Sequence, residues 1–259
     1  MRFDQLLLFG AGLPLLVAIL AVADARGCFR RDRFGTPLRK AAAMALLFLV
    51  LVATVLLPAT ESGIPIDTSR LSFGGVFLVQ GILAAFLALW WLLSGRPPLR
   101  EFFALTSRRP LVEAGAGVCL GLIGWVLTLV VGLVFAVVLR ALHLPAPQAA
   151  SPLVQWIAHL SVLKKLLIVV CAMVVEEFHF RAFLQRRLGA VSASVLFLLA
   201  HAGYGEPYFF VGLLAITVVL AAAFQRTGSV WAPALAHGTF NAVQLFIFLP
   251  EAVRLLPLQ

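Results

Sequence analysis

Long apolar runs, separated by short stretches that carry charge, proline or glycine, limit what this chain can fold into more than any other feature. Eight such runs are present: Leu6–Ala23, Ala41–Leu57, Phe73–Leu93, Leu111–Leu139, Leu166–Phe183, Val191–Ala202, Tyr208–Phe224 and Val230–Leu249. A helix needs roughly 20 apolar residues to cross the hydrocarbon core of a bilayer. A chain that is 62% hydrophobic and 12% charged also has too little polar surface for a soluble domain of this size. The sequence therefore predicts an all-α polytopic membrane bundle of about eight transmembrane helices.

The runs fall into two groups, about four in residues 1–150 and the others in residues 151–259, and we expect both groups to form one membrane domain. The sixth run, Val191–Ala202, is short for a full crossing, so neighbouring helices or a wet cavity should shield it. The stretch Ser151–Lys165 mixes polar and apolar residues and is predicted to be one amphipathic helix at the outer interface, with His159 in an interfacial position.

The basic residues predict the orientation of the bundle. Of the 20 Lys and Arg residues, 13 follow the first, third, fifth and seventh runs and Arg181 lies at the end of the fifth, which places these 14 on one face: Arg26, Arg30, Arg31, Arg33, Arg39, Lys40, Arg96, Arg100, Arg108, Arg109, Arg181, Arg186, Arg187 and Arg226. By the positive-inside rule this face is cytoplasmic and both termini lie outside. Only Arg2 precedes the first run, which argues against a cleaved signal peptide.

The net charge of +9 suggests anionic partners. In a membrane protein, however, excess Lys and Arg more commonly mark cytoplasmic loops and contacts with anionic lipid than nucleic-acid binding. We therefore expect a multi-pass protein of the bacterial inner (cytoplasmic) membrane, with the lipid bilayer as a partner and no nucleic acid.

The stretch VVEEFHFRAFLQ, Val174 to Gln185, places two glutamates about 15 Å along the fifth run at 1.5 Å per residue. A carboxylate at that depth costs several kcal/mol, so such residues usually face a cavity and carry function. Glu177 and Arg181 are four residues apart and can form an ion pair on one helical face. Glu176 lies about 100° away around the helix. The two acids are therefore expected to have different roles, with Glu176 in a cavity and Glu177 in a structural pair.

Two further motifs with a polar residue occur at a similar depth. Phe197 and His201 are four residues apart in the sixth run, and His237 and Asn241 are four apart in the eighth. Each histidine alone is more often a packing residue than a catalyst. Together with Glu176, they form a cluster that predicts a catalytic site inside the bilayer.

Water activation is the chemistry that this cluster favours. Glu176 and His201 would deprotonate a water for attack on a carbonyl, and His237 and Asn241 would donate hydrogen bonds to the oxyanion. No His-Glu-x-x-His helix and no serine nucleophile motif is present. We expect no cofactor and no metal; if a metal is bound, its ligands would be Glu176, His201 and His237, which lack a clear fourth partner.

Three motifs in order, Glu-Glu-x-x-x-Arg (Glu176, Glu177, Arg181), Phe-x-x-x-His (Phe197, His201) and His-x-x-x-Asn (His237, Asn241), resemble the CPBP family of intramembrane proteases, also called the Abi or CAAX protease family, which includes Rce1. The resemblance covers roughly Leu166 to Leu249, within a catalytic core of residues 151–259. It implies an eight-helix bundle with Glu176, His201, His237 and Asn241 as catalytic residues, and Glu177 and Arg181 as their support. His179 falls at a variable position of the motif, and we interpret it as a packing residue.

The resemblance implies an intramembrane endopeptidase, of glutamic or metalloprotease type, that cuts a membrane-anchored protein or peptide, near a C-terminal anchor or sorting signal. The alternative is a non-catalytic protein of the same family, such as a bacteriocin-immunity factor or a scaffold. A transporter is a third interpretation, because buried acids also serve proton relays. The chain lacks the paired halves that inverted-repeat transporters carry.

Overall fold

The structure, a computed structural model, describes residues 3–30, 34–58, 68, 72–144, 152–204 and 207–255. The described residues contain helices and turns and no strand, which confirms the all-α prediction. The main helices in chain order are α1 (Phe3–Ala25), α3 (Pro37–Leu51, extended by Val52–Leu56), α5 (Leu78–Leu93), α6 (Leu99–Phe102), α7 (Pro110–Ala141), α8 (Pro152–Ala158), α9 (Val162–Cys171), α10 (Arg186–Leu188), α11 (Ala190–Ala200), α12 (Pro207–Thr227), α13 (Trp231–Val243) and α14 (Leu249–Leu255).

Each of the eight apolar runs is helical, but the helices differ in length. Among the described residues, five are long and apolar enough to cross a membrane: Pro37–Leu56, Gly75–Leu93, Pro110–Ala141, Phe210–Thr227 and Trp231–Arg254. A sixth candidate is the bent pair of α8 with Val162–Leu188, and Gly10–Ala25 and Ala190–Ala200 are shorter apolar helices. The chain is therefore an integral membrane helix bundle. The sixth run is short, as expected, and packs against α12.

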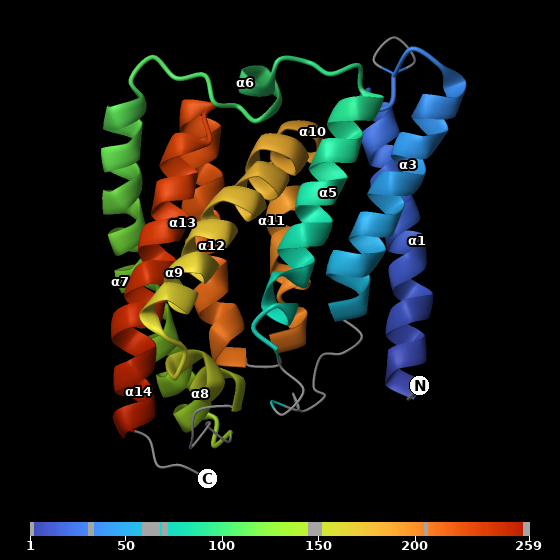
Figure 1. The fold of residues 1–259 in the computed structure, drawn as a ribbon. Helices are drawn as coiled ribbons and strands as arrows, with labels where there is room; N and C mark the ends of the chain where they lie inside the picture. The colour runs from blue at the N-terminus through green and yellow to red at the C-terminus, as the bar shows by residue number, and fades with distance from the viewer. Residues whose placement is uncertain are drawn as a thin grey trace.

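A single continuous helix, Val162–Leu188, runs obliquely through the middle of the bundle (Figure 1). Its central part contacts α5 on one side and α12 and α13 on the other. Helices α1 and α3 pack beyond α5, and α7 packs against α12 and α13 (Figure 1). The two intramembrane glutamates therefore lie on the helix that touches both halves of the molecule.

The central helix is wound unusually over its middle. Residues Ala172–Glu176 and Phe178–Gln185 adopt π-helical turns, with the ordinary α-helical winding resuming at Arg186. π-Helical turns are rare in proteins overall, and those that occur are frequently at functional sites. The wider helix changes the directions of the side chains that it carries. Both glutamates and Arg181 fall inside or next to this segment.

Small residues let helix α13 come close to its neighbours. A Cβ placed on Gly117 of α7 would lie 2.5 Å from the carbonyl oxygen of Ala232, and one on Gly121 would lie 2.5 Å from that of Ala236. Glycines four residues apart are a common means of close helix packing in membranes. The backbone of α13 is therefore fixed at the residue that precedes His237.

A second close approach fixes α13 against the central helix. A Cβ on Gly238 would lie 2.5 Å from the sulfur of Met173, so glycine lets the methionine side chain pack directly on the backbone of α13. Gly238 follows His237, and Met173 lies one turn before Glu177. This contact brings the histidine of one helix beside the glutamate of another.

The predicted single amphipathic helix over Ser151–Lys165 is wrong in one respect. The chain forms α8 up to Ala158, turns through His159, Leu160 and Ser161, and begins a new helix at Val162, with a bend of 111° between the two. Ser161 has the extended backbone of a residue that starts a helix. His159 is exposed at this bend, and Ser151 lies outside the described residues.

Candidate active site

The central helix places two adjacent glutamates near its midpoint. Glu176 is 8% exposed and Glu177 is fully buried. Taking two carboxylates out of water is costly unless each has partners. Their partners differ, which separates the roles of the two acids.

Glu177 lies between a cation and an imidazole. Its Oε2 accepts a hydrogen bond from Arg181 Nε at 3.3 Å, which confirms the ion pair expected from the four-residue spacing. Its Oε1 accepts one from His237 Nδ1 at 2.9 Å. An ionised carboxylate only accepts hydrogen bonds, so the proton shared with His237 is carried on Nδ1. Glu177 therefore fixes the orientation of the His237 ring and leaves Nε2 directed away from the carboxylate.

Arg181 is also fully buried and has further contacts. Its Nη1 donates to Gln185 Oε1 at 3.5 Å, and the Gln185 amide donates to the carbonyl oxygen of Ala221 on α12 at 2.9 Å. The guanidinium carbon lies 5.3 Å from the centre of the Phe197 ring, a cation–π distance. These contacts connect the ion pair to α11 and α12.

Glu176 faces a different set of groups. Its Oε1 accepts a hydrogen bond from Gln80 Nε2 of α5 at 3.2 Å, and its Oε2 lies 3.9 Å from His201 Nε2. The latter distance exceeds a direct hydrogen bond but suits a bridge through one water. Within the described residues, no hydrogen-bond donor reaches Glu176 Oε2.

The tautomer of His201 follows from its other nitrogen. His201 Nδ1 lies 2.7 Å from the carbonyl oxygen of Phe197, which only accepts, so Nδ1 carries the proton. In the neutral ring, Nε2 is then a lone-pair acceptor that faces Glu176 Oε2. Two acceptors 3.9 Å apart suit a water that donates one hydrogen to each.

The remaining predicted residues take different places. Asn241 is half-buried on α13, one turn beyond His237. His179 is fully buried among the rings of Phe86, Phe180 and Phe183, and neither of its nitrogens has a hydrogen-bond partner within the described residues. His179 therefore has the surroundings of a packing residue, as the sequence predicted.

Comparison with known proteins identifies the segment of the chain that contains these residues. Residues 157–243 match the family model described as Type II CAAX prenyl endopeptidase Rce1-like. We call these residues, which resemble that family, the Rce1-like segment. The chain has no significant match among curated proteins or among solved structures. At the level of the family, this is a group of proteases, and the apolar helices make the chain an integral membrane protein.

The Rce1-like segment holds all six predicted site residues: Glu176, Glu177, Arg181, His201, His237 and Asn241. Gln80 lies outside it, on α5, and was missed by sequence reasoning. The signal was present, since Gln80 is the polar residue of an otherwise apolar helix. Gln185, one turn after Arg181, was also missed by sequence reasoning.

The metal-ligand set that the sequence allowed, Glu176 with His201 and His237, does not assemble. Within the described residues, no three His, Cys, Asp or Glu side chains are grouped as metal ligands. His237 Nδ1 and His201 Nδ1 each bond an oxygen of the protein, which leaves Nε2 as the other nitrogen of each ring.

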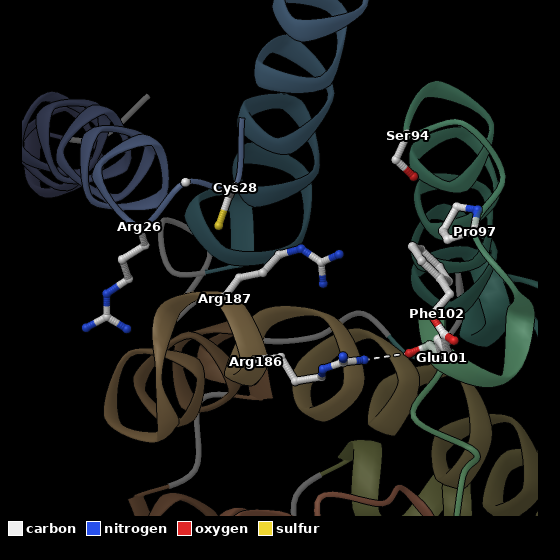
Figure 2. A pocket seen from close by; sticks show the side chains of 9 residues that line it. Arg26, Cys28, Ser94, Pro97, Glu101, Phe102, Arg186 and Arg187 are labelled. Atoms are coloured by element: carbon white, nitrogen blue, oxygen red, sulfur yellow. Dashed lines mark hydrogen bonds between the residues drawn. The ribbon is translucent and has the colours of Figure 1, made fainter. Parts of the chain in front are cut away.

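Two cavities lie outside the Glu–His cluster. One, of about 340 Å³, opens between the ends of α1, α5 and α10 at the basic end of the bundle, and Figure 2 shows Arg26, Arg186 and Arg187 around it. The other, of about 260 Å³, is apolar and lies between α5 and the central helix, lined by Val175 and Phe178 on either side of the glutamates. Neither cavity is lined by any of the six predicted site residues, so a cavity around them stays a prediction, although His201 and Asn241 are partly exposed.

Proposed function

We propose that the chain is an intramembrane endopeptidase that hydrolyses a peptide bond of a membrane-anchored protein or peptide with a water activated by Glu176 and His201. The observation that carries the proposal is the pair of acceptor atoms, Glu176 Oε2 and His201 Nε2, that face each other at 3.9 Å. A water between them would donate both hydrogens and present its lone pair to a carbonyl carbon. The match to a family of CAAX prenyl endopeptidases supports peptide hydrolysis.

The proposed reaction needs only groups of this chain and one water. As the water oxygen bonds to the carbonyl carbon, its proton passes to the Glu176–His201 pair and the carbonyl oxygen becomes an oxyanion. The same proton is then delivered to the leaving amine as the carbon–nitrogen bond breaks. His237 and Asn241 are the proposed donors to the oxyanion.

The pairing of Glu177 with His237 limits how His237 acts. Because Nδ1–H is held by Glu177, His237 donates to an oxyanion only through Nε2–H, which requires the imidazolium form. Glu177 is shared with Arg181, so one negative charge lies between two cations. The triad would then carry a net positive charge of one toward the oxyanion, which favours its formation.

The substrate is proposed to approach from the lipid. The apolar cavity between α5 and the central helix adjoins Glu176 through Val175 and Phe178 and suits an apolar segment or lipid chain of the substrate. Whether the substrate is prenylated is an outcome of the test.

The test uses the purified full chain in detergent with two sets of membrane-anchored peptides, one with and one without a C-terminal isoprenoid. Glu176→Gln and His201→Ala are expected to abolish cleavage. Glu251→Gln and His159→Ala, which change exposed residues of the same types, are expected to retain it. Cleavage that persists in both site variants rejects the water-activating pair, and binding without cleavage in the wild type favours a non-catalytic scaffold.

A further inference from the structure

Gln80, in the first turn of α5, reaches the site from outside the Rce1-like segment through a hydrogen bond. Its amide nitrogen is 3.2 Å from Glu176 Oε1, across 96 residues of sequence. A polar side chain in an apolar membrane helix is costly unless it is bonded, and in membranes such residues commonly mark functional sites. Gln80 thus has a chemical reason to face the central helix.

The contact orders the two oxygens of Glu176. By donating to Oε1, the amide holds the plane of the carboxylate in place. Oε2 is then the oxygen left facing His201 Nε2. This one hydrogen bond therefore gives the two carboxylate oxygens different roles: Oε1 bonds Gln80, and Oε2 faces His201.

The other end of the Gln80 amide is also informative. Its carbonyl oxygen, Oε1, is buried and has no hydrogen-bond donor within the described residues, as is true of Glu176 Oε2. Buried acceptors are nearly always bonded in proteins, to water if to nothing else. Within the described residues, the amide and the carboxylate therefore direct two acceptors without a donor toward one locality, which His201 Nε2 also faces.

We propose that Gln80 is a positioning residue of the hydrolytic site, which holds the Glu176 carboxylate in place through Oε1 and, with its own carbonyl oxygen, helps to seat the water that Glu176 and His201 activate. This rests on the proposed function. It also gives the N-terminal helices, which the family model does not cover, a direct part in the chemistry.

The experiment compares wild type with Gln80→Met, which keeps the length of the side chain and removes both polar groups. Val79→Met, a change at the adjacent, more exposed residue, is the matched control. Two readouts are taken: cleavage kinetics, and the rate at which dicyclohexylcarbodiimide, which reacts with protonated carboxyls in apolar surroundings, modifies Glu176 as followed by mass spectrometry.

For Gln80→Met we expect kcat to fall about tenfold or more with KM changed less than about twofold, because one hydrogen bond to a charged catalytic group is lost. We expect carbodiimide labelling of Glu176 to become faster, since the amide no longer occupies Oε1 and no longer holds the carboxyl group in place. Val79→Met should change neither.

An unchanged labelling rate in Gln80→Met would contradict the hydrogen bond between Gln80 and Glu176. Faster labelling with an unchanged kcat would contradict the positioning role of Gln80. If wild type cleaves none of the peptides, the proposed function fails. The labelling rates still decide whether Gln80 holds the Glu176 carboxyl group in place. A fall in kcat of equal size in Val79→Met would assign the effect to general disturbance of α5.

Discussion

Glu177 Oε1 accepts a hydrogen bond from His237 Nδ1 at 2.9 Å, although 60 residues separate them in the chain. The helices that carry these two residues come close together, because Gly238 has no side chain and Met173 packs against its backbone. It gives the second glutamate of the motif a task that its pairing with Arg181 alone does not reveal. The acid neutralises a buried cation and also orients an imidazole.

This dual role predicts that stability and activity can be separated. Glu177→Gln leaves Arg181 buried without a countercharge and is expected to cost about 3–5 kcal/mol of stability. In Glu177→Leu with Arg181→Leu, both charges are gone and much of that stability should return, because apolar replacement of a buried ion pair is often neutral. Activity should be lost in both variants, since His237 has lost its partner.

The measurements are thermal unfolding in detergent and cleavage by the same preparations. Recovery of activity along with stability in the double variant would show that Glu177 serves only as the countercharge of Arg181. A double variant as unstable as Glu177→Gln would contradict the account of the buried pair.

His179 provides the opposite case. It is buried among Phe86, Phe180 and Phe183, and within the described residues its two nitrogens have no partner. We expect His179→Phe to retain cleavage and to leave thermal stability unchanged or raise it by about 1 kcal/mol, because an unbonded polar group is removed. A loss of cleavage in a variant that unfolds at the wild-type temperature would give His179 a part in the reaction.

Much of the fold was predictable because hydrophobicity and helix length are read along the chain. The apolar runs located the helices, and the four-residue spacing of Glu177 and Arg181 predicted their ion pair. The break before Val162 was missed, since it contains neither proline nor glycine, and Ser161 was its only sequence signal. The π-helical turns were also missed, because a hydrogen bond shifted by one residue leaves no mark on composition.

The sequence was enough to predict which residues form the candidate site, but not which of them bond each other. Glu176, His201 and His237 were expected from intramembrane position and motif order. That His237 bonds Glu177, and that Gln80 bonds Glu176, depends on which helices touch. A single sequence contains little information about contacts between helices, so partners from different helices require the structure.

The orientation of the bundle is a further prediction that the structure makes easy to test. Arg108 lies in the connection before α7 and Leu142 directly follows α7, so the two residues lie at opposite ends of this 32-residue helix. Both are exposed. In a background with Cys28, Cys119 and Cys171 replaced by alanine, a membrane-impermeant maleimide should label Leu142→Cys in intact cells and Arg108→Cys only after permeabilisation. The reverse pattern would place the basic face outside.

The last prediction concerns how α7 holds the site from a distance. Gly121→Ala adds a Cβ that would lie 2.5 Å from the carbonyl oxygen of Ala236, a backbone atom that cannot swing aside, whereas Gly115→Ala on the same helix meets nothing within 4 Å. We expect Gly121→Ala to lose about 1–3 kcal/mol of stability and to lower kcat, because α13 must shift and carries His237 with it. Gly115→Ala should be neutral or slightly stabilising, since alanine favours helix. Thermal unfolding and cleavage measured on both variants decide the matter: equal behaviour of the two glycines would mean that close packing of α7 on α13 does not set the position of His237.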